Sequence, residues 1–440
     1  MPHVPVSILL RCLLLPAILI GCIHASARAS TTPPVSPPAN ASATGPATVV
    51  PADALTERAQ SRQLVWSGVV VAPDGRTFVV MPRLANSSGP QLAQLAADGT
   101  LTPYPDAGWN RAPVTAPTPA GPSDHAPGGA QPAAPAFVGL TAIRLSPDGA
   151  LWAVDTGSPG FGKSALPDAS RLIRIDLGSG QVTRVLTLSA DMLRPKSVLA
   201  DIRFNGGHAY VTDAGAPGLI VVDLAAGSFR RVLDHDPALT GQRPVTVDGE
   251  MLKGPDGKPA MNLGSLLEVT PDGRYLYVQP FCGPMSRIAT ALLDDPQASP
   301  RSLSNGMAFW YDTPALGGMA IAADGTLYLN DLETDSILTL SPARQLGLLL
   351  HDPRLHWAGG SSLGSGGVLT VPVPQLDRAA TFHHGHSQVQ FPVGLYSLKP
   401  VELAAAATQA GKVAAAPAPG PAPAAAKGPA RPDATPRVPP

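Results

Sequence analysis

One short phrase recurs along this chain: a β-rich run, a tight turn built on Asp-Gly or a similar pair, and a second β-rich run. Asp-Gly supplies the positive-φ residues that a tight hairpin turn requires. The six copies turn at residues 73–75, 147–149, 205–207, 271–273, 324–325 and 365–367. Six such turns predict six repeated antiparallel units.

Two of the copies continue into a second hairpin. Residues 172–177 turn into 182–186, and residues 219–224 turn into 229–233. Two hairpins in succession make a four-stranded antiparallel unit, and repetition of that unit is typical of a propeller. We therefore predict an all-β fold, a six-bladed β-propeller of four-stranded blades, over residues 55–402. A β-sandwich is the alternative, but it does not explain the repeated pair of hairpins.

The segments on either side of the predicted propeller differ from it in composition. The chain has 51 Pro and 44 Gly and only 14% charged residues, which favours short elements over long helices. Residues 30–54 form a low-complexity spacer and residues 403–440 an Ala/Pro-rich tail, and neither can bury enough apolar surface to fold. Residues 112–135 are expected to form a long surface loop.

The first 29 residues have the pattern of an export signal. The apolar run at residues 12–20 is too short to span a bilayer, which takes about 20 residues. Residues 19–22 resemble a lipobox with Cys22 as the lipidated residue, whereas residues 27–29 fit ordinary signal peptidase. We expect an exported protein: periplasmic, attached to the outer surface through a lipid on Cys22, or secreted. Cys282 then has no disulfide partner within the folded part and is expected to be a small buried side chain.

The formal net charge of −1, without tracts of Lys or Arg, gives no reason to expect nucleic acid as a partner. Any contact with a membrane is expected only through the lipid anchor. We expect a monomer.

Several short motifs resemble those of one known family. The segment at residues 201–213 continues through 218–224 to 230–233, and similar pieces occur at 151–157 and at 318–321 with 327–328. These segments resemble the major royal jelly protein/yellow family, of which this chain would be a bacterial member. The resemblance implies a six-bladed propeller in a family that is mostly secreted. Some of its members hold small amines in the central channel, and it has no common reaction.

Two segments match the sequence patterns of known functional motifs but lack the structural context that those motifs need. Residues 157–164 fit the P-loop pattern, but Pro167 follows almost at once and leaves no room for the helix that holds phosphates, so we expect no nucleotide. The triplets at 155–157 and 213–215 resemble those of aspartic proteases in sequence, yet they occupy the same place in two repeats and are interpreted as coincidence.

A calcium-dependent lactonase of the gluconolactonase type is the enzymatic alternative, because such enzymes also have six blades. Their cation needs several oxygen ligands near the axis. The corresponding positions here hold Ala200, Ser265 and Gly317, and we expect no metal and no cofactor. The cluster His383, His384 and His386 is interpreted as a solvated loop, with transition-metal binding as the alternative.

The candidate ligand-binding residues are those that the repeats place at strand ends near the axis. They are Arg144, Asp155, Asp201, Arg203, Asp213, Asn330 and Trp357. For each Asp, a hydrogen bond that caps a turn inside its own blade is the alternative. The leading hypothesis is a non-catalytic propeller that binds a small polar molecule of unknown identity in its central channel. The lactonase-like hydrolase and a protein-interaction scaffold are the other two.

Overall fold

Each predicted turn joins the first two strands of a sheet. The computed structural model describes residues 52–83, 89–111, 136–160, 163–254, 256–261 and 264–400, and these contain six four-stranded antiparallel sheets. The turn glycines Gly149 and Gly273 have φ values of 81° and 71°, a conformation that residues with a side chain rarely adopt. The prediction of an all-β fold with six four-stranded blades is confirmed.

The blades follow one another along the chain. Blade 1 contains β2 (Gly68–Val71), β3 (Thr77–Val80), β4 (Leu92–Leu95) and β5 (Leu101–Pro103); blade 2 contains β6 (Leu140–Leu145), β7 (Leu151–Asp155), β8 (Arg171–Asp176) and β9 (Gln181–Thr187). Blade 3 contains β10 (Leu199–Asn205), β11 (His208–Asp213), β12 (Gly218–Asp223) and β13 (Ser228–Val232); blade 4 contains β16 (Ser265–Val269), β17 (Tyr275–Pro280), β18 (Met285–Ala289) and β19 (Ala308–Tyr311). Blade 5 contains β20 (Leu316–Ile321), β21 (Leu327–Asp331), β22 (Ser336–Leu340) and β23 (Leu346–His351). Blade 6 contains β24 (Ser362–Leu363), β25 (Leu369–Pro372), β26 (Val393–Leu398) and β1 (Thr56–Ser61).

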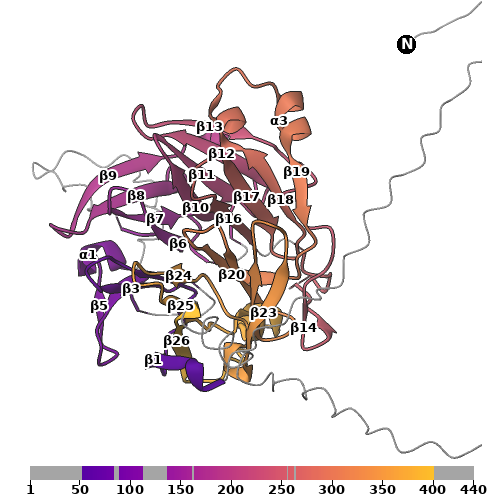
Figure 1. Ribbon diagram of the computed structural model, residues 1–440. Helices are drawn as coiled ribbons and strands as arrows, with labels where there is room; N and C mark the ends of the chain where they lie inside the picture. Colours follow the sequence, from indigo (N-terminus) through magenta and orange to yellow (C-terminus); the bar gives the residue numbers. More distant parts are fainter. Residues whose placement is uncertain are drawn as a thin grey trace, which may run out of the picture. The chain divides into compact units, whose positions relative to one another are not determined.

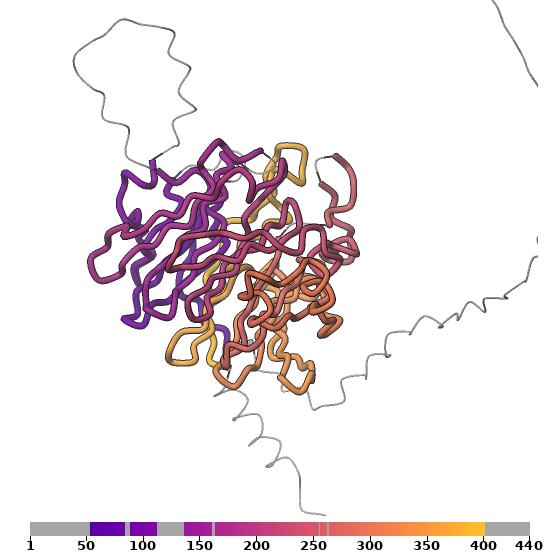
Figure 2. The backbone as a smooth tube through the Cα atoms, turned by 90° about the horizontal axis from the view of Figure 1, so that it is seen from above, coloured from indigo at the N-terminus to yellow at the C-terminus, as the bar shows by residue number. Residues whose placement is uncertain are grey.

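The blades form a closed ring. Their innermost strands contact one another in the cyclic order β2, β6, β10, β16, β20, β24 and back to β2. Figure 1 shows the blades following one another around this ring in the order of the colours, and Figure 2 shows the same backbone from a direction at 90° to that view. The ring closes because β1 pairs with β26, so that blade 6 combines strands from both ends of the described chain (Figure 1). A parallel bridge between Gly68 and Gly360 also joins blade 6 to blade 1.

The hydrophobic core is divided among the interfaces between blades. Six clusters of buried side chains each lie between two neighbouring blades in the described part of the chain. Phe78 of blade 1, for example, packs in one cluster with Ile143 of blade 2. Because both faces of a blade are covered, a strand such as β12 buries five residues in succession instead of alternating.

The other elements of the described chain are short. They are the hairpin of β14 (Thr246–Val247) and β15 (Glu250–Met251), the α-helices α1 (Ala107–Asn110), α2 (Thr290–Asp294) and α3 (Pro300–Gly306), and the 3-10 turns Ala52–Ala54, Ala190–Met192, Pro353–Leu355, Leu376–Arg378 and Ala380–Phe382. No helix of the described residues has the length and apolar character to cross a membrane.

Several sequence-based expectations concern residues outside the described ranges. The export signal at 1–29 with Cys22, most of the spacer at 30–54, the loop at 112–135 and the tail at 403–440 lie there. Cys282 is described, and its side chain is free and buried, as expected.

Candidate functional site

Each innermost strand carries one residue at the same place in its blade. Strand pairing identifies this place: Arg144 lies opposite Trp152, Arg203 opposite Tyr210, and Glu268 opposite Tyr277. The equivalent residues of the other blades are Val70, Ala320 and Ser362. All six line a cavity of about 350 Å³ where the innermost strands end. Three consecutive blades therefore bring charged side chains to the axis, and the other three bring small or apolar ones.

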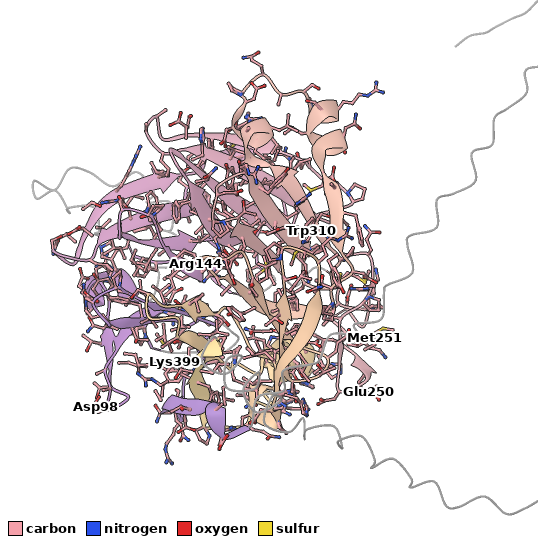
Figure 3. The ribbon with its side chains drawn as sticks, in the orientation of Figure 1. Asp98, Arg144, Glu250, Met251, Trp310 and Lys399 are labelled. Carbon is pink, nitrogen blue, oxygen red and sulfur yellow. The ribbon has the colours of Figure 1, made fainter. Side chains whose placement is uncertain are left out.

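A chain of ion pairs crosses the axis. Arg144 Nη2 lies 3.2 Å from Asp201 Oδ2, Arg203 Nη1 lies 2.8 Å from Asp201 Oδ1, and Arg203 Nη2 lies 2.7 Å from Glu268 Oε1. Asp201 joins this set because the pairing of β10 with β11 is irregular between Leu199 and Ile202, and such an irregularity re-aims a side chain. We call Arg144, Asp201, Arg203 and Glu268 the axial charge cluster. Figure 3 shows Arg144 in the middle of the domain, far from Asp98 and Glu250 at its periphery.

The two arginines of the axial charge cluster differ in how well their charge is compensated. Burial lowers the pKa of Arg203, but the adjacent Asp201 and Glu268 carboxylates outweigh this and raise it above the ordinary value. Burial and the neighbouring Arg203 hold the pKa of Arg144 below its ordinary value. Arg144 has one carboxylate contact, and its Nε finds no hydrogen-bond partner among the described residues. Arg144 is thus the member with unused hydrogen-bonding capacity.

A second cavity, of about 210 Å³, opens where the innermost strands begin, and we call it the axial cavity. Its lining includes the large apolar side chains Leu266, Phe281, Trp357, Leu376 and Phe382. Arg144 and Asp201 are its charged lining residues in the described chain, and Arg144 also lines the cavity at the other end. The axial charge cluster therefore separates an apolar cavity from a more polar one.

The connection between β25 and β26 covers the axial cavity. Leu376, Ala379, Thr381 and Phe382 of this connection all contribute to the cavity lining. Trp357 lies under it, with 1% of its surface exposed, and its indole Nε1 has no hydrogen-bond partner among the described residues. The mostly apolar lining differs from the polar channel that the sequence suggested, because Asp155, Asp213 and Asn330 do not reach the cavity and large apolar side chains such as Phe281 and Phe382 do.

Glycine at the start of β20 allows two blades to meet backbone to backbone. A Cβ atom on Gly317 would lie 2.1 Å from the carbonyl oxygen of Ala358, and one on Gly318 would lie 2.1 Å from that of Gly359. No larger residue fits there without movement of the backbone. Ala200, Ser265 and Gly317, the positions considered for lactonase ligands, do line the axial cavity and offer it a methyl group, a hydroxyl group and no side chain.

The structure brings four of the predicted site residues together and separates three. Arg144, Asp201 and Trp357 line the axial cavity, and Arg203 lies in the axial charge cluster beside it. Asp155, Asp213 and Asn330 line neither of the two axial cavities.

Asp155 and Asp213 hold the backbone of their own blades. Asp155 accepts hydrogen bonds from the amides of Val138 and Gly139 at 2.9 and 2.8 Å, and it pairs with Arg171 at 2.6 Å. Asp213, at the same place in blade 3, accepts from the amide of a residue before β10 at 2.8 Å and pairs with Arg231 at 2.8 Å. Asp155 and Asp213 therefore form the capping hydrogen bonds that were considered above as the alternative to ligand binding.

Asn330 joins blade 5 to blade 6. Its Nδ2 donates to the carbonyl oxygen of Gly359 and to Ser361 Oγ, both at 2.6 Å. Its Oδ1 is buried and has no partner among the described residues.

The described residues of the P-loop-like segment form no helix. Strand β7 ends at Asp155 and β8 begins at Arg171, and Ser158 Oγ lies 2.7 Å and 2.8 Å from the carbonyl oxygens of Gly160 and Lys163. Residues 161–162 lie outside the described ranges. In the histidine segment, His383 Nε2 lies 3.0 Å from the carbonyl oxygen of Asp377, whereas His384 and His386 are exposed.

Sequence reasoning missed Glu268 of the axial charge cluster and several apolar side chains of the axial cavity: Leu266, Phe281, Leu376 and Phe382. Glu268 lies five residues before the turn glycine Gly273, as Arg144 lies five before Gly149, so its repeat position was a usable signal. Phe281 follows the second strand of blade 4 and had no comparable signal, because its place in the cavity depends on a loop.

Comparison with known proteins supports the family resemblance. The family model for major royal jelly protein matches residues 140–346, from the start of β6 to the start of β23. The predicted resemblance to that family is confirmed. No curated protein matches the chain.

Three solved structures illustrate which known propellers the chain resembles. A catalytically inactive virginiamycin B lyase from Staphylococcus aureus with quinupristin is 13% identical, with a TM-score of 0.44 and coverage of 78% of this chain and 99% of that one. The calcium-binding protein regucalcin from Agrobacterium tumefaciens is 12% identical, with a TM-score of 0.45 and coverage of 78% and 93%. A gluconolactonase from Xanthomonas campestris is 11% identical, with a TM-score of 0.42 and coverage of 78% and 89%. Similarity at this level assigns neither an activity nor a ligand.

Proposed function

We propose that this propeller binds a small molecule in its axial cavity, and that the molecule has an aromatic or other apolar body with a hydrogen-bond acceptor such as a carboxylate. The observation that carries the proposal is that two side chains of the cavity wall, Arg144 and Trp357, each contain a buried donor, Nε and Nε1, that lacks a partner among the described residues. A buried donor without a partner costs about 1–3 kcal/mol. A ligand that supplies acceptor oxygens would recover part of that cost.

The charges at the cavity favour an acceptor over an amine. Both oxygens of Asp201 are in use: Oδ1 accepts from the Ile202 amide at 2.9 Å and from Arg203, and Oδ2 accepts from Arg144. An ammonium group would have to share this carboxylate with two arginines, whose positive charges repel it. An acceptor, by contrast, would meet a guanidinium that has spare hydrogen-bonding capacity.

The same residues favour binding over metal-dependent hydrolysis. A hard cation needs several oxygen ligands that converge on it. Ala200 and Gly317 supply none from their side chains, and the carboxylate of Asp201 is already bonded to two arginines. The scaffold alternative has less support, since the exposed large apolar side chains of the described residues come from four separate segments: Val185, Met251, Phe309 and Phe391.

We further propose that the propeller is exported and works as a monomer. The support for export is the signal pattern at residues 1–29, with Cys22 as the lipidated residue if the lipobox is used. The propeller would then meet its ligand outside the cytoplasm.

The ligand class is tested with two probes that differ in one group, phenylacetate and phenethylamine. We expect phenylacetate to bind in isothermal titration calorimetry and phenethylamine to bind much more weakly. Arg144→Gln should weaken phenylacetate binding about 10- to 100-fold, because a hydrogen bond to a charged group contributes about 1.5–3 kcal/mol. Trp357→Phe keeps an aromatic ring but removes the indole donor and should weaken binding several-fold.

The matched control for these variants is Arg174→Gln, which changes a partly exposed ion pair with Asp148 away from the cavity lining. It should leave phenylacetate binding unchanged. If phenylacetate does not bind, or phenethylamine binds as tightly, the proposed ligand class is wrong.

A further inference from the structure

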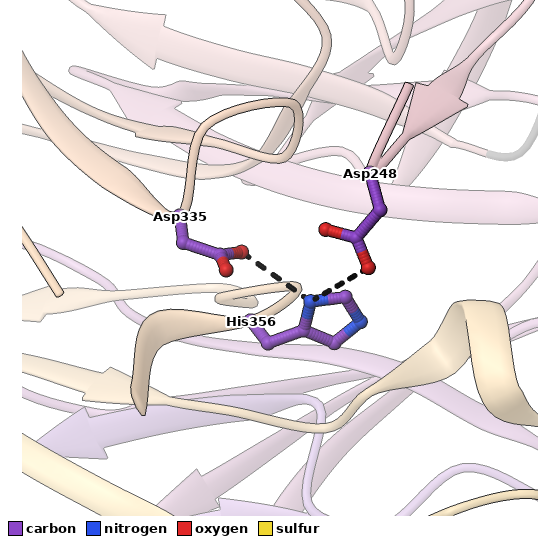
Figure 4. Close-up of side chains that lie close together, drawn as sticks. All are labelled: Asp248, Asp335 and His356. Atoms are coloured by element: carbon purple, nitrogen blue, oxygen red, sulfur yellow. Dashed lines mark ion pairs between the residues drawn. The ribbon is translucent and has the colours of Figure 1, made fainter. Parts of the chain in front are cut away.

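A third cavity, of about 310 Å³, lies beside blades 5 and 6 and the β14–β15 hairpin. Its lining includes Asp248, Asp335, Arg354, His356 and Arg378. One ligand atom from each of Asp248, Asp335 and His356 lies within 4.8 Å of the others (Figure 4). The three residues come from separate parts of the chain: the β14–β15 turn, the β21–β22 turn, and the residue after the 3-10 turn Pro353–Leu355.

The distances in this group are longer than ordinary hydrogen bonds and suit an ion between the ligand atoms. His356 Nδ1 lies 3.4 Å from Asp335 Oδ1 and 3.9 Å from Asp248 Oδ2. An N–H···O hydrogen bond has its two heavy atoms about 2.7–3.2 Å apart. A tetrahedral zinc ion with bonds of about 2.0–2.2 Å holds its ligand atoms about 3.4 Å apart. Small shifts of the Asp248 side chain, which is 67% exposed, would complete this geometry.

A fourth residue fixes the imidazole in the orientation that a metal site requires. His356 is 7% exposed, and its Nε2 lies 3.0 Å from Asp377 Oδ2. With Nε2 donating to that carboxylate, the lone pair of Nδ1 points toward Asp335 and Asp248. Histidines that bind metals regularly donate their other ring N–H to a carboxylate in this way. The second oxygen of Asp377 is buried without a partner among the described residues, a further sign of an incomplete polar group here.

The charges around His356 also favour the binding of a cation. Asp248, Asp335 and Asp377 bring three carboxylates to one imidazole. Arg378 lies 3.8 Å from Asp377, and Arg354 is held by its own partner Asp352 at 2.6 Å. With a neutral imidazole the group keeps an excess of negative charge. One imidazole nitrogen among carboxylate oxygens favours a first-row transition ion such as zinc over calcium, which takes oxygen ligands.

We propose that Asp248, Asp335 and His356 bind a divalent transition-metal ion of the zinc type, and that Asp377 orients the imidazole. The fourth position of the ion faces the cavity and is taken by water. His356 directly precedes Trp357, so the ion would also hold a segment of the axial cavity wall. The proposal does not depend on the ligand proposed above.

The test uses the untagged chain after treatment with a chelator, titrated with Zn²⁺ by calorimetry and with Co²⁺ by visible absorption. We expect one equivalent of Zn²⁺ and a Co²⁺ spectrum typical of tetrahedral N/O ligation. Asp248→Asn and His356→Gln should each weaken Zn²⁺ binding by tenfold or more. The exposed side chain of Asp248 lets the first variant fold, and far-UV circular dichroism checks the second.

The matched control is the double variant His384→Ala/His386→Ala, which removes two exposed imidazoles outside the group. It should bind one equivalent of Zn²⁺ as the unchanged chain does. Loss of binding in this control with retention in Asp248→Asn would move the site to the histidine loop. Absence of stoichiometric Zn²⁺ binding by the unchanged chain would show that the three side chains do not form a metal site. Either result overturns the proposal.

Discussion

Replacing Arg203 with methionine should destabilise the propeller strongly, because Arg203 is the centre of the axial charge cluster. Its side chain is 10% exposed and contacts Asp201 at 2.8 Å and Glu268 at 2.7 Å. Methionine fills a similar volume but leaves Glu268 without its ion pair in a buried position. Removal of one partner from a buried pair costs about 3–5 kcal/mol. For a domain of this length, that loss lowers Tm by about 4–7 °C.

Thermal unfolding followed by circular dichroism measures this difference, and urea unfolding gives the free energy directly. The control is Arg174→Met, the same change at an ion pair in which Asp148 is 58% exposed, which should cost about 1 kcal/mol or less. The reasoning is refuted if Arg203→Met is no more destabilising than Arg174→Met. That result would mean that the four charges on the axis contribute no more than a surface pair.

Three further outcomes are expected. Burial raises the pKa of Asp331 above 3.8. Its ionisation therefore reduces the stability of the folded state as pH rises through the folded-state pKa. Asp331→Asn should remove this pH dependence when unfolding is measured from pH 3 to 7. Gly318→Ala places a methyl group against the Gly359 carbonyl and should cost about 1–3 kcal/mol, whereas Gly366→Ala, with nothing within 4 Å of its Cβ position, should be close to neutral in the same unfolding assay. Cys22→Ser should move the protein from the membrane fraction to the soluble fraction on cell fractionation, and a wild-type protein that is already soluble and begins at residue 30 would contradict the lipobox.

The blades could be predicted from the sequence because their signals are local. A turn glycine with positive φ and the strands on either side of it lie within about a dozen residues, and each hairpin determines its own pairing. Closure of the ring could not be predicted in this way. Strand β1 is polar and mostly exposed, and nothing in its six residues indicates that it pairs with β26, which lies more than 300 residues later in the chain.

A site residue could be predicted from the sequence only where its position in the repeat also makes its side chain point toward the axis. Arg144 and Arg203 occupy equivalent places that face the axis, whereas Asp155 and Asp213 occupy equivalent places that cap their own blades. From the sequence, both pairs are polar residues near strand ends, and only the three-dimensional pairing separates them. The group around His356 had no signal at all, because its members come from loops outside the repeated phrase.

A crystal structure of the chain grown with 4-bromophenylacetate tests the central claim most directly, because the anomalous signal of bromine locates the ligand without interpretation of weak density. We predict a bromine peak inside the axial cavity near Phe281, Trp357 and Phe382, with the carboxylate bonded to Arg144. A bromine peak outside this cavity, or a carboxylate that points away from Arg144 toward solvent, would contradict the account.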